Sequence, residues 1–430
     1  MSNSAPDRNL RPRIHDIGNL TLEPAREVVL SNGITLHILD SGTAEVCRIG
    51  IALPGGTAES PRPALYRIVS QLLEEGTRDL PEGRVAEILE DNGAWHRTSV
   101  TTHHTLTEFY TLNSRFEALL PLIADIIFAP SFPEEAVERT LRQVASARAV
   151  ALRKVSTRAS EALRPLIYGE ESPLAASALP EEVMAITREE IVSAHTARLD
   201  CSGTHIFLAG LVTPAMTESV VRVFGSIGSQ ARFAPAPLDM PVISLPREVT
   251  VDMPDALQSA VDIAIPVPGR MHPDFIKMRM ATCALGGYFG SRLMSSIRED
   301  KGLTYGIQAS LYGYPENGFL VVSTQTDCAN TRMVLTETVS EIERLKNPAT
   351  YSPDEIQRLS RHLLSGLAAI LDSPFTRMDF LQNRVIASTP PDYFDLQQET
   401  VRHLDAGMLA SAAEYFDTSL LQTAIAGRHG

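Results

Sequence analysis

Cysteine is scarce in this sequence of 430 residues, which contains four in all. No two of them form a C-x-x-C pair. This spacing excludes a zinc ribbon and a thioredoxin-like redox motif, because both need paired cysteines. The four positions are Cys47, Cys201, Cys283 and Cys328.

Long apolar runs are absent as well. The longest apolar stretch, residues 118–130, includes Pro121 and Asp125 and is too short for a bilayer, which takes about 20 apolar residues in a helix. Residues 1–16 are polar and have no apolar signal-peptide core. We therefore expect no membrane segment and a cytoplasmic location by default. A periplasmic location stays open, because a chain numbered after processing would look the same.

Basic residues are too few to balance the acidic ones. The 38 Lys and Arg stand against 52 Asp and Glu, which gives a formal net charge of −14. Such a chain binds nucleic acid poorly and is repelled by anionic membrane surfaces. We expect the negative charge to serve solubility.

The order of apolar patterns predicts two α+β domains. The chain is longer than one ordinary domain, and its composition is that of a folded globular protein. Hairpins and long helices occur in each half, and the first hairpin turns at Asn32-Gly33, a pair typical of type I′ turns. A proline-rich stretch predicts a linker. The expected parts are an N-terminal extension (1–24), an N-terminal domain (25–232), a linker (233–247) and a C-terminal domain (248–430).

The second half repeats the order of the first. The string IALPGG at 51–56 returns as IAIPVPG at 263–269, and IFLAG at 206–210 returns as TAIAG at 423–427. The two pairs are separated by nearly the same number of residues. This spacing predicts a duplicated domain, each copy a sheet covered by helices on one face.

A degenerate metal motif lies on the first long helix. The segment ALYRIVSQLLEEGT, residues 64–77, resembles the M16-type peptidases (pitrilysin, insulinase and mitochondrial processing peptidase), in which this helix carries H-x-x-E-H and ends in Gly-Thr. Anchoring on the shared Gly-Thr places Arg67, Ser70 and Gln71 at the positions of histidine, glutamate and histidine. The resemblance covers nearly the whole chain and implies two homologous metallohydrolase-like domains, each a mixed or antiparallel sheet covered by helices.

None of these three side chains can replace the family's residue. Two histidines at i and i+4 hold one zinc ion from one helix face, whereas Arg67 stays protonated and has no lone pair to give. Gln71 is a poor zinc ligand. Ser70 cannot act as the carboxylate base that takes a proton from zinc-bound water. We therefore predict no metal and no cofactor in this chain.

The family's third ligand, a glutamate on a later helix, is missing too. Between Glu138 and Glu161 there is no acidic residue. Two interpretations of the basic residues in this span stay open: a solvated helix face, or a surface that faces an acidic partner. They are Arg139, Arg142, Arg148, Arg153, Lys154 and Arg158.

The remaining histidines do not rebuild a metal site. His103 and His104 are adjacent, so on a strand they point to opposite faces. His96 could join one of them, but no carboxylate follows at motif spacing. In the family this region is an edge strand that pairs with substrate backbone, and it begins with small and amide residues. Here Trp95 and its neighbours replace them, and we expect Trp95 to fill core.

The second half keeps the family's other signature. Residues 285–311, LGGYFGSRLMSSIREDKGLTYGIQASL, resemble the glycine-rich turn, helix, Arg, basic turn and Tyr of the C-terminal domain. The resemblance implies that Arg298 and Tyr305 point into the peptidase chamber, hold the substrate backbone and stabilise the oxyanion. Both supply hydrogen-bond donors where negative charge develops. Spacing alone also permits a structural interpretation, in which Arg298 pairs with a carboxylate and Tyr305 caps the sheet.

Loss of the zinc set and retention of Arg298 and Tyr305 fit one role in this family. Some bacterial M16 peptidases divide the work between a subunit with H-x-x-E-H and a partner with the Arg/Tyr pair. We expect the non-metal subunit of such a heteromeric zinc peptidase, inactive alone, with zinc in the sister subunit and an unfolded peptide as substrate. The alternative is a catalytically inactive pseudo-peptidase that acts as a structural or peptide-binding subunit. A homodimer of the isolated chain stays open.

Overall fold

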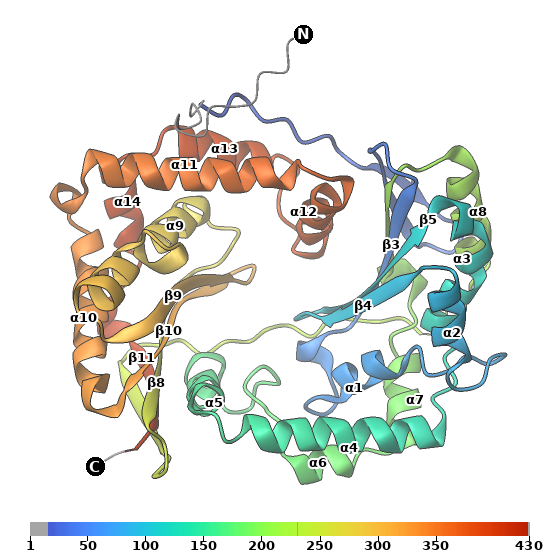
Figure 1. The fold of residues 1–430 in the computed structure, drawn as a ribbon, viewed down its shortest axis with the longest axis horizontal. Helices are drawn as coiled ribbons and strands as arrows, with labels where there is room; N and C mark the ends of the chain where they lie inside the picture. Colours follow the sequence, from blue (N-terminus) through green and yellow to red (C-terminus); the bar gives the residue numbers. More distant parts are fainter. Residues whose placement is uncertain (1–15, 230, 429–430) are drawn as a thin grey trace, which may run out of the picture.

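Two mixed β-sheets lie on opposite sides of the molecule, each covered by helices (Figure 1). The computed structural model describes residues 16–229 and 231–428. Of the expected N-terminal extension, residues 1–15 lie outside these ranges. Residues 16–24 form no helix or strand and run along α13 (Tyr393–Arg402), where the Leu20 N–H donates to Gln398 Oε1 at 2.6 Å.

Sheet 1 belongs to the N-terminal half and has the strand order β1-β2-β6-β3-β5-β4. β6 runs parallel to β2, and the other neighbours are antiparallel. β4 is an edge strand, and within the described ranges it pairs with β5 alone. The strands are β1 (Arg26–Val29), β2 (Thr35–Asp40), β3 (Val46–Pro54), β4 (Trp95–Val100), β5 (His104–Leu112) and β6 (His205–Gly210).

Sheet 2 repeats this arrangement with the order β7-β11-β8-β10-β9, and β11 runs parallel to β7. Apart from β1, both sheets place their first, fifth, second, fourth and third strands side by side. The repeated sequence strings fall on matching strands, one pair on β3 and β8 and the other on β6 and β11. The predicted duplication and the α+β class are confirmed. The strands are β7 (Arg247–Asp252), β8 (Gln258–Pro268), β9 (Thr304–Gly313), β10 (Asn317–Asp327) and β11 (Gln422–Gly427).

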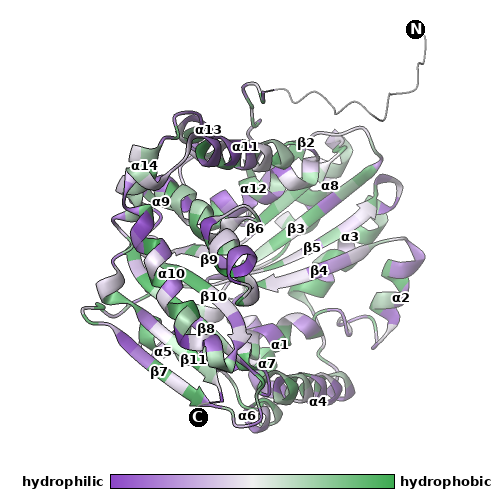
Figure 2. Cartoon of the chain, turned by 60° about the vertical axis from the view of Figure 1, so that its left-hand side comes forward, coloured by the Kyte–Doolittle hydropathy of each residue, from purple (hydrophilic) through white to green (hydrophobic). Residues whose placement is uncertain are grey.

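Helices cover the outer face of each sheet, which carries alternate apolar residues such as Ile49 of β3 and Ile263 of β8. Figure 2 shows β3 mostly hydrophobic and the surface helix α13 mostly hydrophilic. In the described part of the chain, no helix is both long and apolar enough to cross a membrane. Beside sheet 1 lie α1 (Leu65–Leu72), α2 (Arg84–Asp91), α3 (Asn113–Phe128), α4 (Glu134–Ala151), α6 (Pro180–Met184), α7 (Arg188–Thr196) and α8 (Pro214–Gly225). Beside sheet 2 lie α9 (Phe275–Thr282), α10 (Thr331–Leu345), α11 (Pro353–Ile370), α13 and α14 (Ala406–Ala413).

The inner faces of the sheets are partly covered by helices that the two halves exchange. α5 (Val155–Tyr168) belongs to the first half of the sequence but packs on sheet 2, where Leu163 contacts the core that includes Ala264 and Phe319. α12 (Pro374–Ile386) belongs to the second half but packs on sheet 1, where Met378 and Leu381 join its apolar residues. Figure 1 shows α5 beside β8 and α12 beside β3. Each half therefore completes the other's apolar core.

Between the two halves, the residues that the structure describes form no helix or strand until β7 begins at Arg247. Backbone N–H groups near the start of this segment bind it to the first half. The Phe233 N–H donates to Asp200 Oδ2 at 2.9 Å, and the Ala236 N–H donates to Glu59 Oε1 at 3.2 Å. Proline-rich chain of this kind has few N–H groups to offer, so side-chain acceptors fix it at particular points.

The first hairpin forms as expected, but the predicted type I′ turn is wrong. The Leu30 N–H donates to the Ile34 carbonyl at 2.8 Å, which leaves a three-residue loop. A type I′ turn needs positive φ at both central residues, whereas Gly33 has φ of 96° and Asn32 has negative φ. The Asn32 amide donates at 2.8 Å to the carbonyls of both Phe224 and Ile227, so contacts with the end of α8 fix this loop.

Candidate functional site

The degenerate motif positions lie on α1, whose apolar residues at i, i+3 and i+4 bury one face against sheet 1. Arg67 and Gln71, one turn apart, are exposed on the opposite face. Ser70 is buried, and its hydroxyl donates to the Arg67 carbonyl at 2.7 Å. The helix that would present an i, i+4 ligand pair is therefore present, with an arginine and a glutamine at the two ligand positions.

Zinc does not fit this set of donors. Arg67 is a permanent cation, and Gln71 has only a neutral amide. The Ser70 hydroxyl donates its hydrogen bond within its own helix, to the Arg67 carbonyl. In the ranges that the structure describes, no group of three His, Cys, Asp or Glu side chains is arranged to hold a metal ion.

The basic residues of α4 mostly bind their own chain. Arg139 pairs with Glu75 at 2.6 Å and also with Glu82, which ties α4 to the end of α1 and to α2. Arg148 pairs with Glu161 of α5 at 2.6 Å. These two guanidinium groups position helices. The interpretation as a face for an acidic partner is left with three residues that form no ion pair among the described residues: the exposed Arg153 and Lys154 and the half-buried Arg158.

His96 and His103 each pair with a different carboxylate, so they share no ligand position. His96 Nε2 lies 3.3 Å from Glu74, next to α1, and His103 Nδ1 lies 2.5 Å from Glu59. Burial lowers the pKa of His104 to about 4, so its imidazole is neutral near pH 7.

We expect the purified chain to retain far less than one zinc ion per molecule after dialysis, measured by elemental analysis. The reason is the donor chemistry of Arg67, Ser70 and Gln71. One tightly held zinc per chain that is lost on His96→Ala or His103→Ala would contradict this expectation.

Trp95 does not fill core, so that expectation is wrong. Its side chain is 54% exposed and stacks on Tyr110, with ring centres 3.9 Å apart. β4 alternates exposed and half-buried residues, which places Trp95 and Arg97 on the inner face of sheet 1. The edge strand therefore presents an aromatic ring and a cation.

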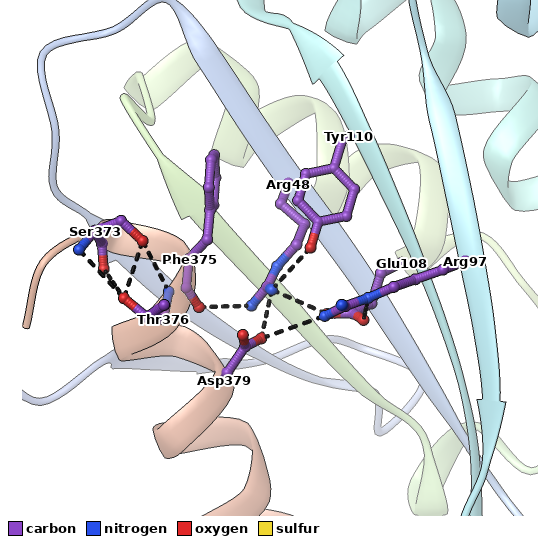
Figure 3. A network of polar contacts seen from close by, with 8 residues as sticks. All are labelled: Arg48, Arg97, Glu108, Tyr110, Ser373, Phe375, Thr376 and Asp379. Atoms are coloured by element: carbon purple, nitrogen blue, oxygen red, sulfur yellow. Dashed lines mark hydrogen bonds and ion pairs between the residues drawn. The ribbon is translucent and has the colours of Figure 1, made fainter. Parts of the chain in front are cut away.

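A buried ionic network beside Trp95 joins the two halves (Figure 3). Arg48 of β3 is fully buried and lies 3.1 Å from Glu108 of β5 and 2.5 Å from Asp379 of α12. It also donates to the Phe375 carbonyl at 3.2 Å, and Arg97 binds Glu108 at 2.5 Å. Sequence reasoning missed this network, although a charged residue inside each of two apolar strands was a visible signal.

Arg298 lies in a short π-helix (Met294–Asp300), which precedes the turn into β9. Its guanidinium carbon lies 4.9 Å from the ring centre of Phe289. It forms no ion pair within the described ranges, so the alternative pairing with a carboxylate is not observed. Gly302, with φ of 61°, reverses the chain between Arg298 and β9.

Tyr305 is the second residue of β9 and is 92% exposed. Its hydroxyl has no hydrogen-bond partner among the described residues. The side chain lines a cavity of about 480 Å³ on the inner face of sheet 2, with Ser156 of α5 on the other side. Arg298 is not part of this lining. The lining also includes Gln258, Asp262, Gln308, Ser323 and Gln325.

Two family models match successive parts of the chain. The model of insulinase (peptidase family M16) matches residues 38–175, and that of the peptidase M16 inactive domain matches residues 185–363. The chain belongs to the M16 peptidase family. The second match begins in the first half and includes β7 to β10 of sheet 2, so it contains both Arg298 and Tyr305 of this M16 chain.

The M16 chain is similar to several known proteins. It is 26% identical over 265 residues to an uncharacterized zinc protease of Mycobacterium leprae, covering 59% of this chain and 58% of that protein. It is 22% identical over 280 residues to the non-peptidase homolog YmxG of Helicobacter pylori, covering 63% and 62%. The chain thus spans less than two thirds of the length of these relatives.

Solved structures resemble nearly the whole M16 chain. The peptidase M16 inactive domain from Pseudomonas fluorescens has a TM-score of 0.85 at 20% identity, covering 94% of this chain and 98% of that one. A protease from Helicobacter pylori has a TM-score of 0.84 at 16% identity, covering 94% and 100%. At these identities the likeness establishes the fold alone.

Proposed function

We propose that this chain is the non-metal subunit of a two-chain M16 peptidase. In this role Arg298 and Tyr305 bind the substrate backbone and stabilise the oxyanion. The zinc ion and its base belong to a sister subunit with H-x-x-E-H. The substrate is an unfolded peptide enclosed between the two chains.

The observation that carries this proposal is the exposure of Tyr305 beside a cavity on the inner face of sheet 2. The fold leaves the phenol 92% exposed and unbonded within the described chain, on the inner side of sheet 2. Peptide hydrolysis places negative charge on the scissile carbonyl oxygen, and a neutral O–H donor aimed at that oxygen lowers the barrier. Arg298, which has no ion-pair partner among the described residues, keeps its donors available for the same carbonyl.

A peptide-binding subunit without catalytic function is the second candidate. Its support is the similarity to a relative named as a non-peptidase homolog, together with the chemistry of Arg67, Ser70 and Gln71. Both candidates predict an inactive chain in isolation. They differ in whether Arg298 and Tyr305 contribute to the rate of an assembled complex.

Co-expression with an M16 sister subunit that bears H-x-x-E-H tests the proposal. We expect a complex on size-exclusion chromatography and cleavage of a quenched fluorescent peptide by that complex, with no cleavage by either chain alone. Full activity of the sister subunit by itself, unchanged by this chain, would refute the proposal.

A further inference from the structure

A buried carboxylate lines the cavity beside Tyr305. Asp262 of β8 is 7% exposed, and Ser323, directly opposite on β10, hydrogen-bonds to it. Burial raises the pKa of Asp262 to about 6. A buried carboxylate ordinarily has a cationic partner, because desolvation without one is costly. No cationic side chain of the described residues contacts Asp262.

Most of the remaining side chains of the lining can accept hydrogen bonds, and a few are apolar. Among the described residues, Asp262 and Tyr305 are the only ionisable side chains of this lining. Gln258, Gln308 and Gln325 add amide oxygens. A volume of about 480 Å³ lies within the range of ligand pockets, about 300–1,000 Å³. The cavity therefore suits a cationic guest with many donors.

We propose that this cavity binds the basic side chain of a bound peptide, with Asp262 as its counter-ion. A guanidinium group has five N–H donors, which match the two oxygens of Asp262 and the neighbouring amide oxygens. The exposed ring of Tyr305 offers a face for a cation at the rim. The inference rests on the proposed function, since it assigns a side-chain preference to the peptide held there.

The positive N-terminal end of α5 opposes the binding of a cation, but its charge is smaller than that of ionised Asp262. Ser156 brings the first turn of α5 to the cavity, and a helix N-terminus carries about +0.5 of an elementary charge. Asp262 carries a full negative charge when ionised and is more deeply buried, so solvent screens it less. The balance favours a cation at Asp262.

Fluorescence anisotropy with two labelled, unfolded peptides tests this inference on the full chain. The peptides differ at one position, arginine in one and its neutral isostere citrulline in the other. We expect the arginine peptide to bind about 10–100-fold more tightly, the range for hydrogen bonds to charged groups. Asp262→Asn should abolish this preference. Asp327→Asn, which removes an exposed charge from β10 outside the cavity, should preserve it.

Each outcome of the anisotropy experiment either supports or overturns the proposed subsite at Asp262. Equal affinity of the unmodified chain for both peptides overturns the subsite and leaves the proposed function standing. Equal loss of preference in both variants also overturns it, because the effect is then one of overall charge. Failure of the chain and of its two-subunit complex to bind either peptide overturns both the subsite and the proposed function. The comparison on the unmodified chain holds even if a variant fails to fold.

Discussion

Replacing Tyr305 by Phe is expected to lower kcat of the assembled two-chain peptidase by about 10²–10³-fold, the usual loss for one oxyanion donor. The substitution removes a hydroxyl that has no partner in the described part of the chain, so stability should not change. The effect should fall on kcat rather than KM if the contact tightens only in the transition state. Steady-state hydrolysis of a quenched fluorescent peptide measures both constants.

Tyr312 provides the matched control. It is an exposed tyrosine on the same strand and lies outside the cavity, so Tyr312→Phe should leave kcat unchanged. Arg298→Ala should cost at least as much as Tyr305→Phe, because it removes a charge as well as donors. Size-exclusion chromatography must show that every variant assembles with the sister subunit. If an assembled Arg298→Ala/Tyr305→Phe complex hydrolyses the peptide as fast as the parent, the pair is not catalytic and the peptide-binding alternative is the better one.

The duplicated fold could be predicted from the sequence because each copy contains the local patterns that are typical of its own helices and strands. The apolar residues at i, i+3 and i+4 of α1 form a buried helix face, and Thr187 and Glu190, three residues apart, form the capping box of α7, in which Thr187 accepts from the Glu190 N–H. The matching sequence strings lie on β3 and β8, which are central strands buried on both faces. Burial on both faces requires apolar residues at successive positions in both copies. Local rules of this kind need no knowledge of distant contacts.

The contacts between the halves could not be predicted from local patterns. The apolar residues of α5 indicate that one face of the helix is buried, but they do not indicate which sheet buries it. In the structure α5 packs on the sheet of the other half. Trp95 looked like core because it is large, yet its ring lies on an inner face that the helices leave open. The surroundings of Asp262 come from β10 and α5, which are distant in the sequence, so no local pattern indicates that it lines a cavity.

Replacing Arg48 by Met is expected to lower the free energy of unfolding by about 3 kcal/mol, the lower end of the cost of breaking a buried ion pair. Arg48 is fully buried, and its loss removes one of the two arginines that pair with Glu108, which is 3% exposed. Arg97 still binds Glu108, which is why the lower end applies. Urea denaturation followed by circular dichroism measures the change.

Two further variants separate the charge from the packing. Arg48→Met/Glu108→Met removes both buried charges and should recover most of the loss, because an apolar pair avoids the desolvation cost. Asp379→Asn should cost at most about 1 kcal/mol, since Asp379 is 38% exposed and its attraction to Arg48 is screened. An Arg48→Met chain that unfolds at the parent's urea concentration would contradict the assignment of this network as a stabilising contact.

In the Arg48→Met chain, the contact between the two halves should also be lost at a lower urea concentration than the rest of the structure. Arg48 holds the Phe375 carbonyl of α12, and Phe375 packs edge-on against Tyr110, on which Trp95 stacks. Trp95 is the chain's single tryptophan, so its fluorescence reports on the contact between α12 and sheet 1. In the parent, fluorescence and circular dichroism should change together, as expected for one cooperative unit. In Arg48→Met the fluorescence should change at lower urea, because α12 leaves sheet 1 before the helices of either half unfold.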